Sequence, residues 1–107
     1  MRWILVLALL AGPARADGKL DAAGIGAALR GRVLAYDDGS TQSFRPDGET
    51  VYNNGQDSIG HWNIEGDRYC SVWPPSDHWA CYDVTVAGDA ISFVADSGSA
   101  SVGHVKN

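Results

Sequence analysis

Two cysteines placed symmetrically about a proline-rich turn constrain this chain more than any other feature of its sequence. Cys70 and Cys81 flank the residues Pro74-Pro75-Ser76-Asp77, with strand-forming residues on both sides. An antiparallel hairpin over residues 60–86 brings the cysteines directly opposite each other, at the short Cα separation that a disulfide requires. A redox or zinc-binding pair is disfavoured, because redox pairs usually have a Cys-x-x-Cys spacing and zinc sites need about four ligands. We therefore predict a cross-strand disulfide.

The first 16 residues have the pattern of an export signal. A short positive region, Met1-Arg2, precedes an unbroken apolar run over residues 3–11, and Ala14-Arg15-Ala16 has the small-x-small form of a signal-peptidase site. The run is too short to span a bilayer, so we expect no membrane anchor. We predict a signal peptide over residues 1–16 and one small β-rich domain over residues 17–107, periplasmic or secreted, where an oxidising compartment favours the disulfide.

The chain is acidic, and removal of the signal would make it more so. Two of the eight basic residues, Arg2 and Arg15, precede the expected cleavage site, whereas all 13 acidic residues follow it, so the formal charge of −5 becomes −7. Such a charge repels phosphate backbones and argues against nucleic acid as a partner. The acidic residues are spread among turns instead of forming a run, so solubility is the simpler interpretation.

Short strands alternate with turns from Arg32 onward, at the spacing of all-β sandwiches and barrels. The connections are too short for crossover helices, so neighbouring strands must be antiparallel. A short helix precedes them, with Asp21 as its N-cap and Gly31 in the left-handed position after its end. We predict an up-and-down meander of about eight strands, closed or nearly closed into a barrel and plugged by the helix, with a coiled open sheet as the alternative. The expected strands are 32–36, 41–45, 49–53, 59–64, 68–73, 78–87, 90–95 and 99–105.

Alternation along these strands assigns one set of side chains to a shared interior. The set comprises Leu34, Tyr36, Gln42, Phe44, Trp62, Ile64, Tyr69, Trp73, Tyr82, Val84, Val86, Ile91, Phe93 and Val102. An eight-stranded barrel is just wide enough to be filled by such side chains, so we expect a filled interior. The disulfide would then lie on the outer face, beside Val72 and Trp79, unless a bulge near the Pro-Pro turn reverses the assignment.

One motif carries a resemblance to a group of known proteins: Gly60-x-Trp62-x-Ile64-x-Gly66-Asp67-x-x-Cys70-x-x-Trp73, followed by Cys81-Tyr82-x-Val84 and Gly88-Asp89. It resembles small exported proteins of Gram-negative bacteria, in which a Gly-x-Trp strand leads into a two-cysteine hairpin. The resemblance covers most of the chain after the signal and implies a periplasmic β-rich domain. It carries over no catalytic residues, because its motifs are turn glycines, tryptophans and a disulfide.

The candidate binding patch lies around the proline-rich turn and comprises Trp73, Asp77, His78 and Trp79. Trp73 and Trp79 fall on opposite faces of the hairpin, so we expect at least one to be partly exposed, and exposed aromatic side chains mark interfaces. We predict a non-enzymatic binding module whose aromatic end meets a small ligand or an envelope protein. Inhibition of a secreted enzyme is one form of this function.

The alternative function is a small hydrolase or isomerase in which His78 acts with Asp77 or Asp83 in acid–base catalysis. The sequence offers no Gly-x-Ser-x-Gly elbow, phosphate loop or dinucleotide fingerprint. The histidines, His61, His78 and His104, are scattered, so we predict no metal site and no cofactor. A purely structural envelope protein is a third possibility.

Overall fold

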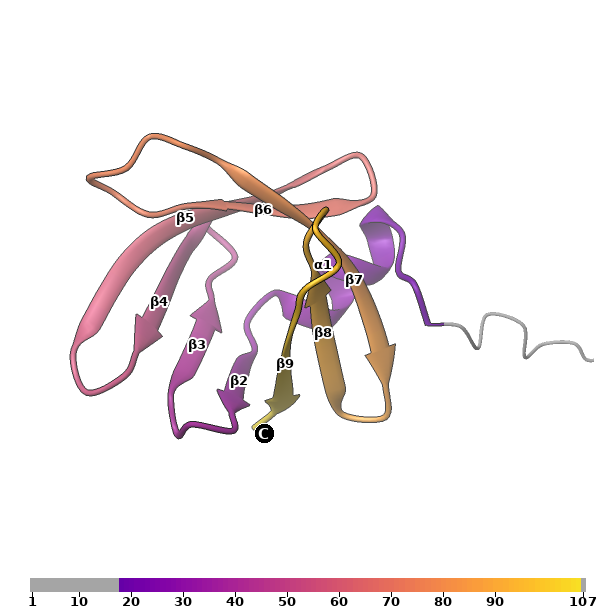
Figure 1. Ribbon diagram of the computed structural model, residues 1–107, viewed down its shortest axis with the longest axis horizontal. Helices are drawn as coiled ribbons and strands as arrows, with labels where there is room; N and C mark the ends of the chain where they lie inside the picture. The colour runs from indigo at the N-terminus through magenta and orange to yellow at the C-terminus, as the bar shows by residue number, and fades with distance from the viewer. Residues whose placement is uncertain (1–17, 107) are drawn as a thin grey trace, which may run out of the picture.

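Short turns make each strand of this chain pair with its neighbour in sequence. The structure, a computed structural model, describes residues 18–106. Its elements are α1 (Ala22–Leu29), β2 (Val33–Tyr36), β3 (Thr41–Phe44), β4 (Glu49–Asn53), β5 (Asp57–Glu65), β6 (Arg68–Val72), β7 (Ala80–Ala87), β8 (Ala90–Val94) and β9 (Ala100–Val105). Every strand runs antiparallel to the next, and β9 pairs with β2, so the eight strands close into a barrel (Figure 1). The prediction of an all-β, up-and-down barrel with one N-terminal helix is confirmed.

The predicted signal peptide, residues 1–16, lies outside the described residues. The segment that leads into α1 is held against β7: the Leu20 amide donates to the Val84 carbonyl at 2.8 Å, and the Val86 amide donates to the Gly18 carbonyl at 3.0 Å. Within residues 18–106, no helix has both the length and the apolar character needed to cross a membrane.

Two aspartates cap the start of helix α1. The Asp21 side chain accepts from the Gly24 amide at 2.9 Å, as the sequence predicts, and Asp67 of the β5–β6 turn accepts from the Ala22 amide at 2.8 Å. Both bonds satisfy amides that have no partner within the helix. Because Asp67 belongs to the barrel wall, its bond also fixes the helix to the sheet. At the other end, Gly31 adopts the predicted left-handed conformation, with φ +75°.

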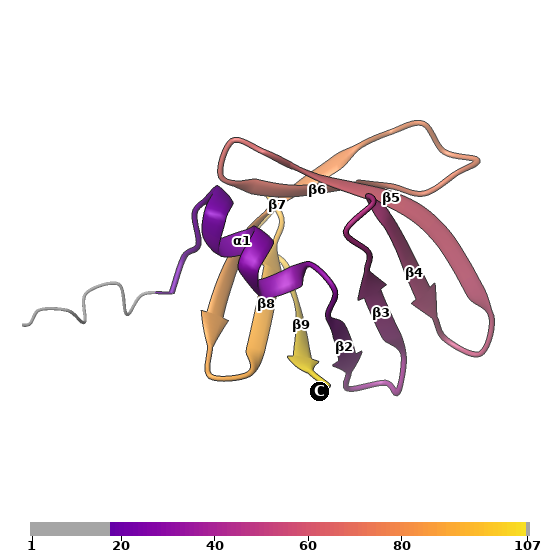
Figure 2. The ribbon, with the colours of Figure 1, turned by 180° about the vertical axis from the view of Figure 1, so that it is seen from behind.

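Helix α1 closes one of the two ends of the barrel. It lies behind the strands in Figure 1 and in front of them in Figure 2, where the molecule is seen from behind. Ile25 and Leu29, which are one turn apart on the same helix face, are fully buried. The Arg30 guanidinium lies over the Trp62 ring, 5.7 Å from its centroid, in a cation–π contact. The helix is therefore the plug that its weak, glycine-containing sequence predicts, stable through packing more than through its own propensity.

An aromatic cluster fills the half of the barrel next to α1. Phe44 is at its centre, with ring centroids 5.8 Å from Trp62, 5.8 Å from Tyr69 and 6.1 Å from Phe93. The Trp62 indole N–H donates to the Arg45 carbonyl at 3.0 Å, so its one polar group is satisfied. The full core cluster is Ile25, Leu29, Leu34, Phe44, Trp62, Tyr69, Val84, Ile91 and Phe93.

The prediction that Val102 belongs to the interior set is wrong, because its side chain points outward. It is 40% exposed and pairs with Ser92, whereas Phe93 pairs with Ser101 and Ile91 with Gly103. The inward positions 101 and 103 of β9 thus hold small residues, a serine and a glycine. A Cβ atom on Gly103 would lie 3.0 Å from the Tyr36 ring and 3.2 Å from the Leu34 side chain, so the bulk of these neighbours occupies the space in front of β9.

The opposite orientations of Val84 and Val102 give a matched test of the fold. Val84→Ala removes fully buried methyl groups and is expected to lower the free energy of unfolding by about 2 kcal/mol. Val102→Ala, on the outer face, should change it by less than about 0.5 kcal/mol. Urea unfolding followed by circular dichroism measures both, and equal losses would contradict the register of β9.

Candidate ligand-binding site

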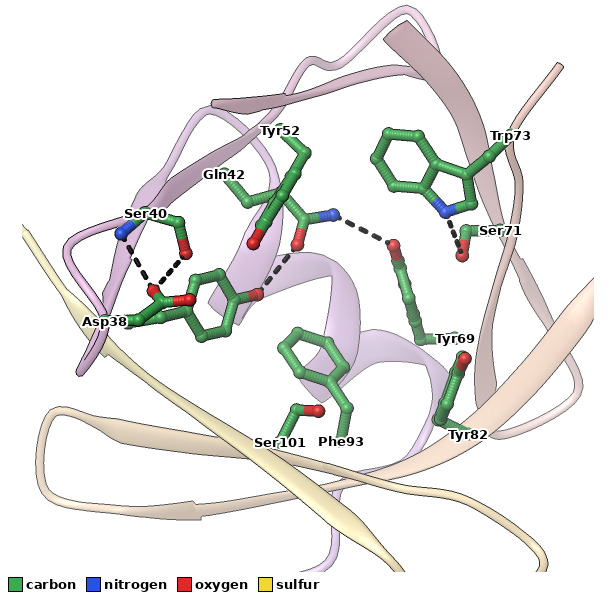
Figure 3. Close-up of a pocket in the computed structure, with 11 residues that line it drawn as sticks. Asp38, Ser40, Gln42, Tyr52, Tyr69, Ser71, Trp73, Tyr82, Phe93 and Ser101 are labelled. Carbon is green, nitrogen blue, oxygen red and sulfur yellow. Dashed lines mark hydrogen bonds between the residues drawn. The ribbon is translucent and has the colours of Figure 1, made fainter. Parts of the chain in front are cut away.

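The end of the barrel opposite α1 contains a cavity of about 300 Å³. Six aromatic side chains line it: Tyr36, Tyr52, Tyr69, Trp73, Tyr82 and Phe93. Five polar side chains complete the lining: Asp38, Ser40, Gln42, Ser71 and Ser101. Figure 3 shows these side chains converging from several strands, with α1 behind them. The expectation of a filled interior is therefore wrong for this half of the barrel, where β9 contributes only small residues to the inside.

All four tyrosines of the chain line this one cavity. The Tyr36 and Tyr52 rings are 6.4 Å apart, and Tyr52 meets Trp73 edge-on at 6.5 Å, so these three form one side of the mouth. Tyr69 lies deeper, 6.1 Å from Tyr82 and 4% exposed. Alternation along the strands predicts a packed core for three of the tyrosines and does not place Tyr52. The sequence feature that could have indicated a cavity is the number of tyrosines at inward positions. A phenol combines an apolar ring with a polar hydroxyl, so it suits a cavity with polar groups better than a fully apolar core.

Gln42 organises a buried hydrogen-bond network at the floor of the cavity. Its Oε1 accepts from the Tyr36 hydroxyl at 2.7 Å, and its Nε2 donates to the Thr50 hydroxyl at 3.0 Å and to the Tyr69 hydroxyl at 3.3 Å. Thr50 in turn donates to the Ser43 carbonyl at 2.7 Å. A glutamine amide has two donors and one acceptor oxygen, and all three groups are used here. The network therefore fixes the orientation of two of the cavity's tyrosines.

Burial keeps two of these phenols protonated. It raises the pKa of Tyr36 well above the usual range of tyrosine, with smaller contributions from the neighbouring Tyr69, Tyr52 and Asp38. It also raises the pKa of Tyr69, against the opposing effect of its hydrogen bonds to Ser71 and Gln42. Both hydroxyls are therefore neutral hydrogen-bonding groups at physiological pH.

Asp38 is the one charged residue that the described part of the chain contributes to the lining, and it lies at the rim. Its Oδ1 accepts from the Ser40 hydroxyl at 2.5 Å and from the Ser40 amide at 2.9 Å. These bonds, first that of the hydroxyl and then that of the amide, lower the pKa of the carboxyl. Asp38 is therefore a carboxylate at neutral pH, held in place by the turn between β2 and β3.

Trp73 lies at the mouth because Gly60 leaves room for it. A Cβ atom at residue 60 would lie 2.7 Å from the indole ring of Trp73 and 2.6 Å from the Val72 carbonyl oxygen. The Trp73 N–H donates to the Ser71 hydroxyl at 3.3 Å. An adjoining surface depression, lined by Tyr52, Ser58, Ile59, Trp73 and Pro74, extends from the same indole. The Gly-x-Trp strand thus places one tryptophan in the core and makes space for another at the cavity.

The predicted binding patch is divided between two faces of the hairpin. Trp73 lines the cavity, whereas Trp79, 44% exposed, lies on the outer face in a shallow depression with Asn63, Glu65 and the two cysteines. Asp77 and His78 are exposed in the connecting loop. The structure therefore brings Trp73 together with the tyrosines and not with Trp79.

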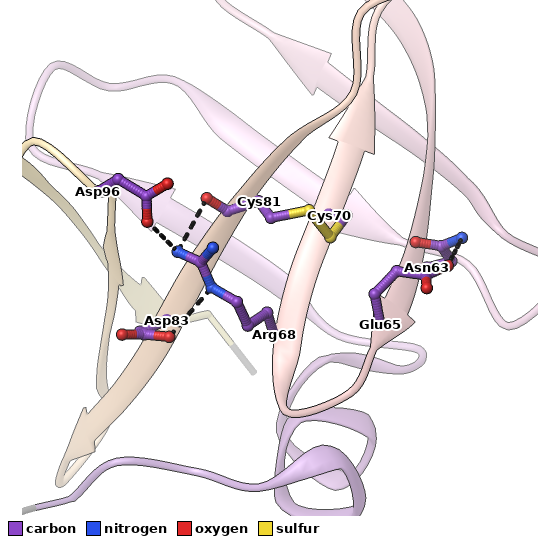
Figure 4. The surroundings of a disulfide bond; sticks show 7 residues. All are labelled: Asn63, Glu65, Arg68, Cys70, Cys81, Asp83 and Asp96. Atoms are coloured by element: carbon purple, nitrogen blue, oxygen red, sulfur yellow. Dashed lines mark hydrogen bonds and ion pairs between the residues drawn. A yellow bond between two sulfur atoms is a disulfide. The ribbon is translucent and has the colours of Figure 1, made fainter.

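The predicted disulfide between Cys70 and Cys81 is present, on the outer face of β6 and β7 (Figure 4). Beside it, Arg68 donates from Nε to Asp83 at 3.1 Å and from Nη2 to Asp96 at 2.8 Å. Its Nη2 also donates to the Cys81 carbonyl, at 3.3 Å. This arginine thus links β6, β7 and the β8–β9 turn around the disulfide.

The acid–base pairs that the sequence suggested are not assembled in the described part of the chain. Asp83 is engaged by Arg68, and within residues 18–106 the only hydrogen bond of His78 runs from its backbone amide to the Ser76 hydroxyl, at 3.1 Å. His104 pairs instead with Asp89, at 3.4 Å on the surface. Between residues 18 and 106, no three His, Cys, Asp or Glu side chains gather as possible metal ligands.

Comparison of the chain with models of protein families, with curated proteins and with solved structures gives no match. The residues of the cavity therefore provide the evidence for function.

The raised pKa values of Tyr36 and Tyr69 predict a loss of stability at high pH. The folded protein keeps these protons at a pH where the unfolded chain, with tyrosine pKa values near 10, releases them. This contribution to stability is therefore complete below about pH 10 and falls as the pH rises above it. Urea unfolding between about pH 8 and 11 measures the slope. The double variant Tyr36→Phe/Tyr69→Phe should have a shallower decline, and an unchanged slope would assign the loss to other groups.

Proposed function

We propose that this protein is a non-enzymatic binding module that takes a small organic ligand into the open end of its barrel. The observation that carries the proposal is the cavity in which all four tyrosines and Trp73 meet. Ligand sites are mostly aromatic and apolar clefts of about 300 Å³ or more, with a few placed polar groups. An eight-stranded barrel is of the right width to hold one small ligand.

The side chains of the cavity suit a ligand with a flat or apolar body and some polar groups. Aromatic rings from β2, β4, β7 and the end of β6 offer faces and edges for stacking. Ser71 and Ser101 add hydroxyls, and the Gln42 network holds its tyrosines in fixed positions before any ligand arrives. Such preorganisation favours binding, because the protein loses little conformational entropy when the ligand enters.

Binding is better supported than catalysis. The hydrolase or isomerase alternative needs the His78 ring bonded to an aspartate, and among residues 18–106 no hydrogen bond joins it to Asp77 or Asp83. The compartment is part of the proposal: the predicted export signal and the disulfide both favour a periplasmic or secreted binding protein. An envelope protein as partner is the other form of the binding hypothesis, with Trp79 as the exposed aromatic residue.

A variant in which a bulky side chain fills the cavity tests whether small ligands bind there. Ser101→Phe places a ring inside the mouth, whereas Val102→Phe, on the next residue of β9, places the same ring on the outer surface. A library of small aromatic fragments is screened by ligand-observed NMR against the wild-type protein and both variants. We expect fragments to bind the wild type and Val102→Phe similarly, and Ser101→Phe at least about tenfold more weakly, because the added ring occupies their site.

Circular dichroism and thermal unfolding establish that both variants keep the fold. Fragments that bind all three proteins equally would place binding outside the barrel and contradict the proposal. The absence of any bound fragment would contradict it as well.

A further inference from the structure

We propose that the ligand of this cavity is an organic cation, an ammonium or guanidinium group on an apolar or aromatic body, held between the Asp38 carboxylate and the aromatic mouth. The inference rests on the proposed function and specifies its ligand class. Three features of the site support it: the charge of the lining, the anchoring of Asp38 and the arrangement of the rings.

The side chains that line the cavity carry negative charge and no positive charge among residues 18–106. Among the eleven side chains of residues 18–106 that line the cavity, only Asp38 carries a charge, and none is a lysine, arginine or histidine. The chain as a whole is also acidic, with a formal charge of −5. An anionic ligand would meet no positive partner in this lining, whereas a cation would be attracted to the rim before it enters.

Asp38 is anchored in a way that leaves one carboxylate oxygen available. Both bonds from Ser40, at 2.5 Å and 2.9 Å, go to the same oxygen, Oδ1. Figure 3 shows the other oxygen turned toward the pocket. The bonds from Ser40 also lower the pKa of the carboxyl, so the group is ionised at neutral pH. A fixed, ionised acceptor of this kind forms the strong, charge-assisted type of hydrogen bond with a cationic donor.

The aromatic rings of the mouth supply the second element of cation recognition. Tyr36, Tyr52 and Trp73 follow one another along the wall, with centroid separations of 6.4 Å and 6.5 Å. Ring faces carry partial negative charge and attract ammonium and guanidinium groups, most strongly where water is excluded. Because Tyr36 is also fixed by Gln42, its ring is held in place beside the acidic rim.

Three probes of similar shape and different charge test the inference: benzylammonium, benzyl alcohol and benzoate. NMR titration at low ionic strength measures their affinities for the wild type, Asp38→Asn and Asp37→Asn. The amide oxygen introduced by Asp38→Asn would still accept the Ser40 bonds, and Asp37→Asn is the matched control, because it removes the same charge from the same turn outside the lining. We expect benzylammonium to bind best, to lose about fivefold or more in affinity in Asp38→Asn, and to change by less than about twofold in Asp37→Asn.

The outcomes separate this inference from the proposed function. If benzyl alcohol binds as tightly as benzylammonium and Ser101→Phe weakens both, the barrel is a ligand site but the inference of a cation is wrong. A preference for benzylammonium that survives in Asp38→Asn, or a preference for benzoate, would likewise overturn the inference. If none of the three probes binds while other fragments bind the wild type and not Ser101→Phe, the inference of a cation is wrong and the proposed function stands.

Discussion

The pairing of β2 with β9 is the interaction on which the rest of the structure depends. It joins the first and last strands of the meander, at Tyr36 and Gly103 among other pairs, and so removes both exposed edges of the sheet. Gly103 makes this closure compatible with two large inward neighbours, since a side chain there would press on Tyr36 and Leu34. Once the sheet is closed, the interior of the barrel has two ends, and different kinds of side chain line them.

The end next to α1 is apolar and the opposite end is partly polar, and Gln42 marks the boundary between them. Phe44, two residues further along β3, is fully buried at the centre of the aromatic cluster. Gln42 is 8% exposed and satisfies each of its amide groups with side chains of neighbouring strands. A buried polar group without partners would be costly, so the network allows a cavity with polar walls to lie next to an apolar core. Tyr69 belongs to both regions, with its ring in the core and its hydroxyl in the network.

Much of the fold could be predicted from the sequence, because turns and alternation are local properties. The predicted strands agree with the structure to within about two residues, the usual uncertainty of element boundaries, and the disulfide and the Asp21 cap followed from spacing alone. The orientation of Val102 could not be predicted, because the sequence of the Gly/Ser-rich turn before β9 does not specify the register of that strand. The cavity could not be predicted either: periodicity shows which side chains face inward, but not which strand ends meet or how much space small residues such as Ser101 leave between them.

The separation of the two ends has a consequence for how such a protein can diversify. Residues of the mouth such as Tyr52 and Ser101 lie outside the core cluster that, with α1, fills the other end. Changes among them alter the shape and polarity of the cavity while the plug, the closure of β2 on β9 and the disulfide stay as they are. In a lineage built on this barrel, substitutions at one rim can therefore reshape the cavity while the interactions that fold the chain stay unchanged.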